Sequence, residues 1–321
     1  MSLETEMVLD RRNLRRRMGL WRGLAIAAAV IAVGAVIQVT GFAGSVADTR
    51  HVARVSIEGM ITEDRSMLRL LRRLETNRNV AGVILFINSP GGTTTGGEAL
   101  YESIRSLSAK KPVVAQFGTV AASAAYITGL GADHIVARGN SITGSVGVIF
   151  QWPEVSGLLD KVGVKMNEIK SGPLKAVPSL YEPISPEGRR TAEAMVAESQ
   201  RWFVGLVASR RGVKTAEIPG LEEGRVFSGR EALSHKLVDA VGGENEVLRW
   251  LNETRSVPKD LRIVDWRPRR DNDFGLLRFM GLAIARMVGG EAAEAFVSDE
   301  RTFGRLALDG LVSVWQPPKS E

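Results

Sequence analysis

The order of apolar and polar positions in the first half of the chain predicts alternating strands and helices. Residues 51–61 (HVARVSIEGMI) alternate with the period of a strand, and residues 80–88 (VAGVILFIN) form the continuous β-branched run of a strand buried on both faces. The same reasoning predicts helices at 66–74, 95–108 and 121–131 and a strand at 112–117. This order predicts an α/β fold with a mainly parallel sheet and crossover helices.

The sequence pattern in the second half of the chain predicts one long helix with shorter elements before and after it. Ser185 followed by Pro186 is a typical helix start, and Gly212 is a typical helix end. Between them, Met195, Trp202, Phe203 and Leu206 form an apolar stripe. The remaining pattern predicts strands at 134–137, 146–150 and 165–169, a helix at 155–162, a turn and short helix within 224–243, and an amphipathic segment at 273–288.

An uncharged apolar run at residues 23–44 predicts a membrane anchor. Its 22 residues would span about 33 Å as a helix, which is enough to cross a bilayer. Residues 1–22 hold six arginines and three acidic side chains, so this tip is expected in the cytoplasm and the rest of the chain outside it, on the periplasmic side of the inner (plasma) membrane. The alternative is a cleaved signal peptide, but the run is longer than a typical signal core.

Composition excludes several classes of function. The tip holds half of the formal net charge of +6, and no basic patch interleaved with aromatic residues follows, so nucleic-acid binding is not expected. The chain has no cysteine, which excludes disulfides and thiolate metal sites. Its three histidines (His51, His134 and His235) lack metal-ligand spacing, and SPGG lacks the lysine of a phosphate-binding loop. No cofactor and no metal are therefore expected.

Residues 118–129 (GTVAASAAYITG) place Ser123 among small residues at a predicted turn from strand to helix. Such a turn exposes the hydroxyl of a nucleophilic serine. The base is not evident, because each of the three histidines is better explained by a structural role. Most of the lysines examined lie at helix ends or on exposed strands (Lys110, Lys111, Lys161, Lys165 and Lys236). Lys175 instead lies in a loop stiffened by proline, where it is either an ordinary loop residue or a base held in a fixed pose.

The turn SPGG at residues 89–92 supplies a third candidate component. Acyl transfer needs backbone N–H donors directed at the developing oxyanion, and Gly92 and Ala124 would supply two of them. A lysine base that works near neutral pH must lose about three pKa units from the usual value of about 10.4. Only a closed, dry pocket disfavours the charged form by that much.

Five motifs in order resemble the signal peptide peptidase A family. They are NSPGG (88–92), AASAAY (121–126), TGSVGVI (143–149), KSGPLKA (170–176) and GRVFSGREA (224–232), within a resemblance that runs from about residue 51 to 243. Members are membrane-associated Ser/Lys peptidases with the fold of Clp protease and crotonase. The resemblance implies Ser123 as nucleophile, Lys175 as general base, Gly92 and Ala124 as oxyanion donors, peptide substrates such as signal-peptide remnants or membrane-protein fragments, and a ring of identical subunits.

The chain departs from the family where Ala124 and Ala125 replace two glycines after the nucleophile. This departure keeps an inactive scaffold as one alternative, and a crotonase-like acyl-CoA enzyme is the other. The expected organisation is a cytoplasmic tip at 1–22, an anchor at 23–44, a peptidase domain at 45–250 and a C-terminal extension at 251–321 that matches no motif.

Overall fold

The computed structural model describes residues 21–22, 49–268 and 312–314. The chain divides into two compact units, Met1–Arg50 and His51–Glu321. Of the first unit, residues 21–22 are helical, whereas the expected anchor at 23–44 lies outside the described residues, as does the amphipathic segment at 273–288. Within the described ranges, no helix has the length and apolar character needed to span a bilayer.

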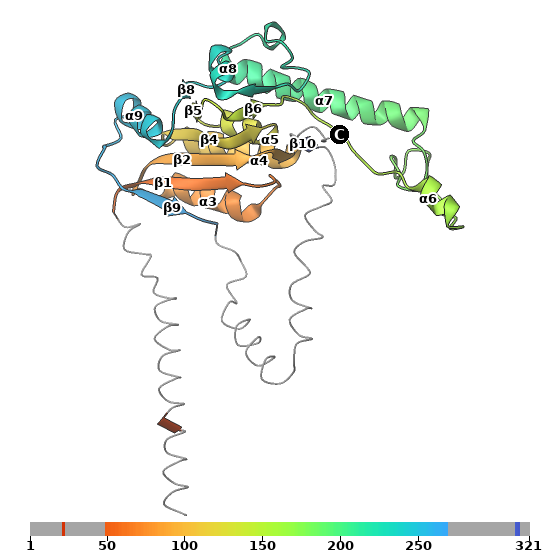
Figure 1. Ribbon diagram of the computed structural model, residues 1–321. Coiled ribbons are helices and arrows are strands. Elements are labelled where there is room, and N and C mark those ends of the chain that lie inside the picture. The colour runs from red at the N-terminus through yellow and green to blue at the C-terminus, as the bar shows by residue number, and fades with distance from the viewer. Residues whose placement is uncertain (1–20, 23–48, 269–311, 315–321) are drawn as a thin grey trace, which may run out of the picture. The chain divides into compact units, whose positions relative to one another are not determined.

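The second unit is built on parallel strands joined by helices (Figure 1). In chain order its first elements are β1 (His51–Glu58), α3 (Arg65–Thr76), β2 (Val80–Ser89), β3 (Gly91–Thr93), α4 (Thr94–Ser108), β4 (Val113–Ala122), α5 (Ala124–Leu130), β5 (His134–Ala137) and β6 (Ile142–Gly144). There follow α6 (Ser156–Lys161), α7 (Pro186–Arg211), a 3-10 turn (Thr215–Glu217), β7 (Val226–Ser228), α8 (Gly229–Ser234), β8 (Ala240–Val241), α9 (Glu244–Arg255), β9 (Ile263–Trp266) and β10 (Val312–Val314).

The main sheet has the strand order β7-β6-β4-β2-β1-β9, and β5 pairs with β4 and with β8. Every pairing in it is parallel except β6 with β7. β4 is long enough to pair with β5 along its first half and with β6 along its last three residues. The expected mainly parallel α/β fold is therefore confirmed.

Two hydrophobic cores cover opposite faces of the sheet. On one face, alternate residues such as Val55, Leu85 and Ala115 pack against α3, α4 and α5, and α7 adds Phe203 to this core. On the other face, α9 covers a smaller core around Ile84. Neighbouring strand residues such as Ile84 and Leu85 join opposite cores, because side chains alternate between the two faces of the sheet.

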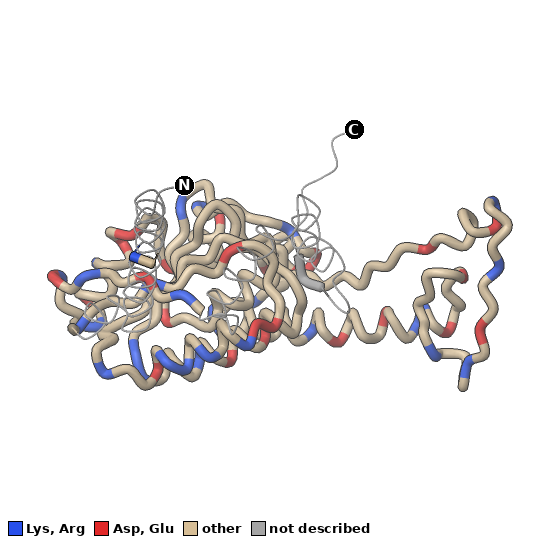
Figure 2. Tube along the Cα trace, turned by 90° about the horizontal axis from the view of Figure 1, so that it is seen from below, with Lys and Arg blue, Asp and Glu red and all other residues tan. Residues whose placement is uncertain are grey.

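The long helix α7 begins and ends where its sequence predicts. The Ser185 hydroxyl accepts a hydrogen bond from the Gly188 N–H at 3.1 Å, Pro186 occupies the first turn, and Gly212 ends the helix in the left-handed conformation. Its apolar stripe is only half confirmed, because Phe203 is buried and Met195 is exposed. The first turns of α7 extend beyond the sheet together with residues 150–185, which we call the arm (Figures 1 and 2).

Several shorter expectations were wrong. The strand at TGSVG is β6, which ends with Thr143 and Gly144, the first two residues of this motif. No strand forms at 146–150 or at 165–169. Apart from a single bridge position at Ile149, the residues of these two stretches are not paired with a strand in the described part of the chain. The chain beyond residue 250, where no motif was found, contributes β9 beside β1 and β10 beside β3.

Candidate active site

Ser123 lies in a strained turn between β4 and α5. Its backbone has φ 61° and ψ −122°, a combination that side-chain-bearing residues seldom adopt. The turn is held on both sides, because the Ser123 N–H donates to Gly144 O at 2.9 Å and its carbonyl accepts from the Ile127 N–H at 3.0 Å. Strain that the surrounding structure maintains in this way is typical of a functional position.

The turn after β6 supports Ser123 from one side. Gly144 and Ser145 both have positive φ, and the Ser145 N–H donates to Arg225 O at 2.9 Å. A Cβ at Gly144 would lie 2.7 Å from the Phe227 ring, so only glycine fits beside β7. The motifs TGSVG and GRVFSG therefore pack together beside the Ser123 turn and support it.

Gly92, in β3, lies on the other side of the Ser123 turn, and its position leaves no space for a side chain. A Cβ there would be 1.8 Å from Ile61 O, because the Ile61 N–H donates to Gly91 O and the Thr93 N–H donates to Ile61 O, each at 2.9 Å. The backbone of β3 is thereby fixed in an extended form next to α5, which it contacts.

The helix that follows Ser123 packs closely against α4. A Cβ at Gly97 would lie 3.2 Å from both Cβ and O of Ala124, and Ala124 and Ala125 are fully buried. The methyl group of Ala124, where the family has glycine, is therefore accommodated by the missing side chain at Gly97. As the first residue of α5, Ala124 has an N–H without an intrahelical acceptor. The two expected oxyanion donors thus belong to neighbouring elements, β3 and α5.

The three histidines have structural surroundings. His51 stacks on Trp266, whose Nε1–H donates to His51 Nε2 at 3.0 Å, and His134 stacks on Trp250 with ring centroids 4.8 Å apart. Burial lowers the pKa of His134. His235 meets the Phe227 ring edge-on. His51 and His134 begin parallel strands, whereas Ser123 follows the end of one, so they lie at the opposite edge of the sheet.

Lys111 differs from the solvated residue that its sequence position suggested. It donates to Asn77 O at 2.5 Å and to Val80 O at 2.8 Å, and partial burial lowers its pKa. A lowered pKa favours a lysine base, but Lys111 precedes β4 whereas Ser123 follows it. Ten strand residues span roughly 33 Å, which is far beyond the reach of a proton transfer.

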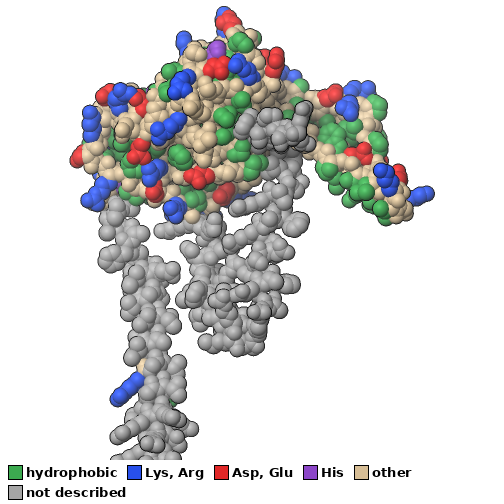
Figure 3. Space-filling model, in the orientation of Figure 1, with side chains coloured by type: hydrophobic (Ala, Val, Ile, Leu, Met, Phe, Trp, Pro, Cys, Tyr) green, Lys and Arg blue, Asp and Glu red, His purple; other side chains and the backbone are tan. Residues whose placement is uncertain are grey.

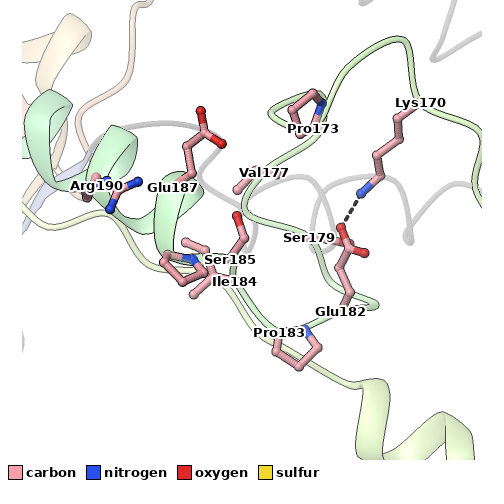
Figure 4. Close-up of a pocket in the computed structure, with 11 residues that line it drawn as sticks. Lys170, Pro173, Val177, Ser179, Glu182, Pro183, Ile184, Ser185, Glu187 and Arg190 are labelled. Atoms are coloured by element: carbon pink, nitrogen blue, oxygen red, sulfur yellow. Dashed lines mark hydrogen bonds and ion pairs between the residues drawn. The ribbon is translucent and has the colours of Figure 1, made fainter.

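The arm carries the two lysines of KSGPLKA, which have different surroundings, and Figure 4 shows those of Lys170. Lys170 forms ion pairs with Glu182 and, at 3.1 Å, with Glu168, and the hydrogen bonds to these carboxylates raise its pKa. Lys170 is thus held in its charged form and is poorly suited to accept a proton. Lys175 is exposed, its N–H donates to Gly172 O at 3.1 Å, and the next residue, Ala176, has a positive φ of 60°.

The loop that carries Lys175 is folded onto the start of α7. A Cβ at Gly188 would lie 2.2 Å from Cγ1 of Val177, and a cavity of about 520 Å³ separates the loop from the helix. This cavity, drawn in Figure 4, is lined by Lys170, Pro173, Val177, Ser179, Glu182, Pro183, Ile184, Ser185, Pro186, Glu187 and Arg190. The residues around Ser123 take no part in it.

The expected nucleophile and the expected base lie at different levels along α7. Gln200 Nε2 donates to Val146 O at 3.0 Å, which places the turn beside Ser123 near Gln200, whereas the Lys175 loop contacts Gly188. These helix positions differ by 12 residues (200 minus 188), or about 18 Å. Within one chain the structure thus brings Ser123, Gly92 and Ala124 together but leaves Lys175 apart from them.

Two further properties bear on the chemistry of this site. Ser123 has 0% exposure, so a substrate can reach it only after a rearrangement of its surroundings. Among the residues whose structure is described, no group of three or more His, Cys, Asp or Glu side chains could hold a metal ion. The chemistry that the arrangement offers is attack by a hydroxyl beside backbone N–H donors.

Comparison with protein families finds two matching domains. Residues 105–258 match the family described as Peptidase family S49, and residues 38–138 match the Clp protease family. The first match contains Ser123 and the whole arm, and the second contains β1 to β4 and the Ser123 turn.

Relatives in three organisms cover most of the folded part. The chain is 34% identical over 203 residues to a putative protease of Synechocystis sp., covering 63% of this chain and 73% of that one. It is 33% identical over 245 residues to a putative protease of Methanocaldococcus jannaschii, covering 76% and 77%. It is 28% identical over 235 residues to a putative signal peptide peptidase SppA of Enterococcus faecium, covering 69% and 68%.

Among solved structures, the chain is similar to a mutant of a membrane-bound stomatin-specific protease. That similarity has a TM-score of 0.43 at 18% identity and covers 69% of this chain and 99% of the other. The family is established by the sequence matches, in which the relatives share about a third of their residues over most of their length. The chain belongs to peptidase family S49, the family of signal peptide peptidase A, and is a serine-type peptidase.

Proposed function

We propose that this peptidase hydrolyses internal peptide bonds with Ser123 as nucleophile and Lys175 as general base. The observation that carries the assignment of Ser123 is its backbone, which is strained at φ 61° and supported by two hydrogen bonds at the end of a central strand. Family membership makes acyl transfer the relevant chemistry, and Ser123 is the residue in the AASAAY motif with a hydroxyl directly before a helix start.

The proposed reaction proceeds through an acyl-enzyme. The neutral amine of Lys175 takes the proton of Ser123 Oγ as this oxygen attacks the scissile carbonyl carbon. The N–H groups of Gly92 and Ala124 donate to the resulting oxyanion. The C–N bond then breaks, and the lysine gives its proton to the leaving amine. Water attacks the ester and Lys175 accepts its proton. The ester C–O bond then breaks, and Lys175 returns the proton to Ser123 Oγ, which releases the acid and restores both side chains.

We further propose that Lys175 serves the Ser123 of a neighbouring subunit. Lys175 is exposed, and its loop contacts α7 about 18 Å along the helix from the level of the turn beside Ser123, so a neighbouring subunit is the better source of a base in a dry environment. The arm carries many exposed apolar side chains (Leu158, Val162, Val164, Met166, Ile169, Leu174, Leu180 and Tyr181), which Figure 3 shows gathered at its surface. An apolar surface of this extent is typical of an interface.

A groove on α7 adds to the apolar surface of the arm. Its cavity of about 460 Å³ is bounded by Phe150, Trp152, Ile184 and Val196, among other residues. A second copy of the chain that covers the arm and this groove would exclude water from Lys175. Burial disfavours the charged form of a lysine, and a neutral amine is what the proposed reaction requires.

The remaining parts of the proposal concern location and substrates. Residues 23–44 would anchor the chain in the plasma membrane, with the peptidase unit on the extracytoplasmic side. There it would cut peptides that lie near the membrane surface, such as remnants of signal peptides or fragments of membrane proteins. The similarity to a putative signal peptide peptidase of Enterococcus faecium supports this substrate class.

Mixed assemblies of two inactive variants test the pairing of Ser123 and Lys175. Ser123→Ala and Lys175→Ala should each abolish hydrolysis of an apolar peptide, and assemblies containing both should regain part of the activity at interfaces with one intact Ser123 and one intact Lys175. Lys175→Arg should stay inactive, because a guanidinium remains charged and accepts no proton. Lys170→Ala is the matched control and should retain activity.

Three outcomes would contradict the proposal in different ways. Verified mixed assemblies without activity would mean that both groups of the pair come from one subunit. Substantial activity of Lys175→Arg would remove Lys175 from the mechanism altogether. If the unaltered chain neither cleaves peptides nor reacts at Ser123 with a serine-directed acylating reagent, the inactive scaffold of the same fold is the better description.

A further inference from the structure

The outer face of α3 is lined by arginine. The exposed residues of this helix are Arg65, Arg69, Arg72 and Thr76, and spacings of three and four residues place them on one face. The opposite face is apolar, and its leucines are fully buried in the larger core (Leu70, Leu71 and Leu74). We call Arg65, Arg69 and Arg72 the arginine face of α3.

The arginine face is unfavourable for the helix by itself. Arg65 and Arg69 are four residues apart, the next arginine follows three residues later, and like charges at these spacings repel one another. Asp64 attracts Arg69, but the acidic residue within the helix, Glu75, is hydrogen-bonded to Lys110. A partner with several phosphate groups would replace this repulsion by attraction, because guanidinium groups bind phosphate through paired N–H donors.

α3 runs from the edge of the sheet that holds the candidate site to the edge at which the chain enters. It follows the end of β1 and leads to Val80, which lies opposite His51 (Figure 1). Residues 45–50 separate His51 from the apolar run, and six extended residues reach about 20 Å at most. Before the helix begins, Ile61 holds both sides of Gly92 through its backbone hydrogen bonds.

We propose that the arginine face of α3 binds the phosphate groups of anionic phospholipids and holds the peptidase unit against the bilayer. The helix has 12 residues, so it would lie along about 18 Å of the headgroup layer. Its first turn would then bring Ile61 and Gly92 close to the membrane surface, where peptides that leave the bilayer are first met. The inference rests on the proposed anchor and substrates, and it names the partner that orients the unit.

An anionic bilayer suits this face better than a partner that must be bound from solution. The proposed anchor would keep the face within reach of the headgroups at all times, so that each further contact is made within one assembly. Basic residues next to a membrane-spanning segment are attracted to anionic lipids over about a Debye length, roughly 10 Å at 0.1 M salt. Three arginines on one helix face are sufficient for such a contact.

Quenching by lipids that carry a quencher on the headgroup tests the proposal. The chain has no cysteine, so Thr76→Cys provides a single site for a fluorescent label next to the arginine face. The full chain, which also carries Ser123→Ala, is reconstituted in vesicles of phosphatidylcholine, alone or mixed with phosphatidylglycerol. The label should be quenched more strongly in the anionic vesicles, and about 1 M salt should remove the difference, because it shortens the Debye length to roughly 3 Å.

A triple variant shows whether the arginines cause this difference. Arg65→Gln together with Arg69→Gln and Arg72→Gln should reduce the quenching in anionic vesicles to that in phosphatidylcholine. The matched control loses the same charge from exposed arginines on α7, α8 and α9 (Arg201, Arg230 and Arg249). This control should be quenched like the unaltered face. A label at Glu253→Cys, on the helix that covers the other face of the sheet, should show no dependence on phosphatidylglycerol.

The outcomes separate this inference from the proposed function. Equal quenching in the two kinds of vesicle, or equal quenching of the triple variant and its control, would overturn the role of α3 and leave the proposed nucleophile and anchor unaffected. Recovery of the full chain apart from both kinds of vesicle would contradict the proposed anchor as well as this inference. Quenching of the label only by a second, quencher-labelled copy of the chain would show that the arginine face contacts another subunit instead. Because these proteins lack the nucleophile, a failure of the proposed peptidase mechanism does not change the result.

Discussion

At Ser123 the backbone adopts a conformation that favours glycine. A substitution at this position can therefore raise the stability of the protein while it removes the hydroxyl that the proposed reaction requires. The positive φ of 61° is maintained by hydrogen bonds to Gly144 and Ile127. A residue with a Cβ in such a region costs on the order of 1 kcal/mol. The chain therefore has a serine at a position where its own backbone would be more stable with glycine.

Ser123→Gly should raise the free energy of unfolding by about 1 kcal/mol and abolish hydrolysis, because it relieves the strain and removes the hydroxyl. Ser123→Ala is the control, since it removes the same hydroxyl but keeps the Cβ. Urea denaturation of the three proteins measures the difference. Equal stabilities of the glycine and alanine variants would show that the backbone at position 123 is not strained.

A second residue-scale prediction concerns His134. Burial lowers its pKa, while the carboxylate of Asp239, 3.7 Å from Nδ1, opposes this effect. The unfolded chain therefore binds the proton more readily than the folded one. The resulting stability is fully present above the unfolded pKa of about 6.5 and is lost as the pH falls through the folded pKa.

Replacement of His134 by phenylalanine should make stability less dependent on pH in this window. The variant His134→Phe keeps an aromatic ring on Trp250 and has no proton to bind. The free energy of unfolding should fall less between pH 7.5 and pH 5 than it does in the unaltered chain. An equal fall in both proteins would mean that other groups account for the acid sensitivity.

At the scale of elements, the contact between α4 and α5 decides whether the Ala124 N–H is correctly placed. Gly97 leaves space for the Ala124 methyl, and a Cβ there would lie 3.2 Å from it. Because α5 is anchored at its far end by Arg210, which donates to Leu130 O at 2.8 Å, crowding at its start must shift the first turn. That turn carries the proposed oxyanion donor.

Gly97→Ala should lower kcat of peptide hydrolysis at least tenfold, although alanine favours a helix over glycine by about 1 kcal/mol. The double variant Gly97→Ala with Ala124→Gly should recover activity, since it moves the methyl from one helix to the other. Gly205→Ala, on an open face of α7, is the control and should gain stability without loss of rate. Failure of the double variant to recover would show that the contact does not position the donor.

Local sequence signals predicted the elements that depend on local chemistry. The β-branched run of β2 and the capping residues Ser185 and Gly212 specify their structures within a few neighbouring residues. The same holds for the turn from strand to helix at Ser123, which its small neighbours and its position before a helix indicated. Wrong expectations arose where pairing partners decide the structure, as at 165–169, which has strand-like residues but is not paired with a strand among the described residues.

The features that sequence could not predict depend on long-range contacts. The fit of Gly97 to Ala124 joins residues from two helices, and the pairing of β10 with β3 joins segments separated by most of the chain. The exposed position of Lys175 was also unexpected, because proline stiffening indicates a fixed loop but not where that loop lies. Only the folded arrangement shows that the arm carries Lys175 beyond the end of the sheet.

At the scale of the whole molecule, the proposed division of the site between the Ser123 turn of one subunit and the arm of another has a consequence for the cell. A peptidase divided between subunits has no competent site while its chains are separate, so newly made copies are harmless wherever they are dilute. Proteolysis then begins only where copies accumulate, and its rate rises more steeply than the amount of protein. The arm would in this way convert crowding in the membrane into a threshold for activity, without any inhibitor or cleaved pro-segment.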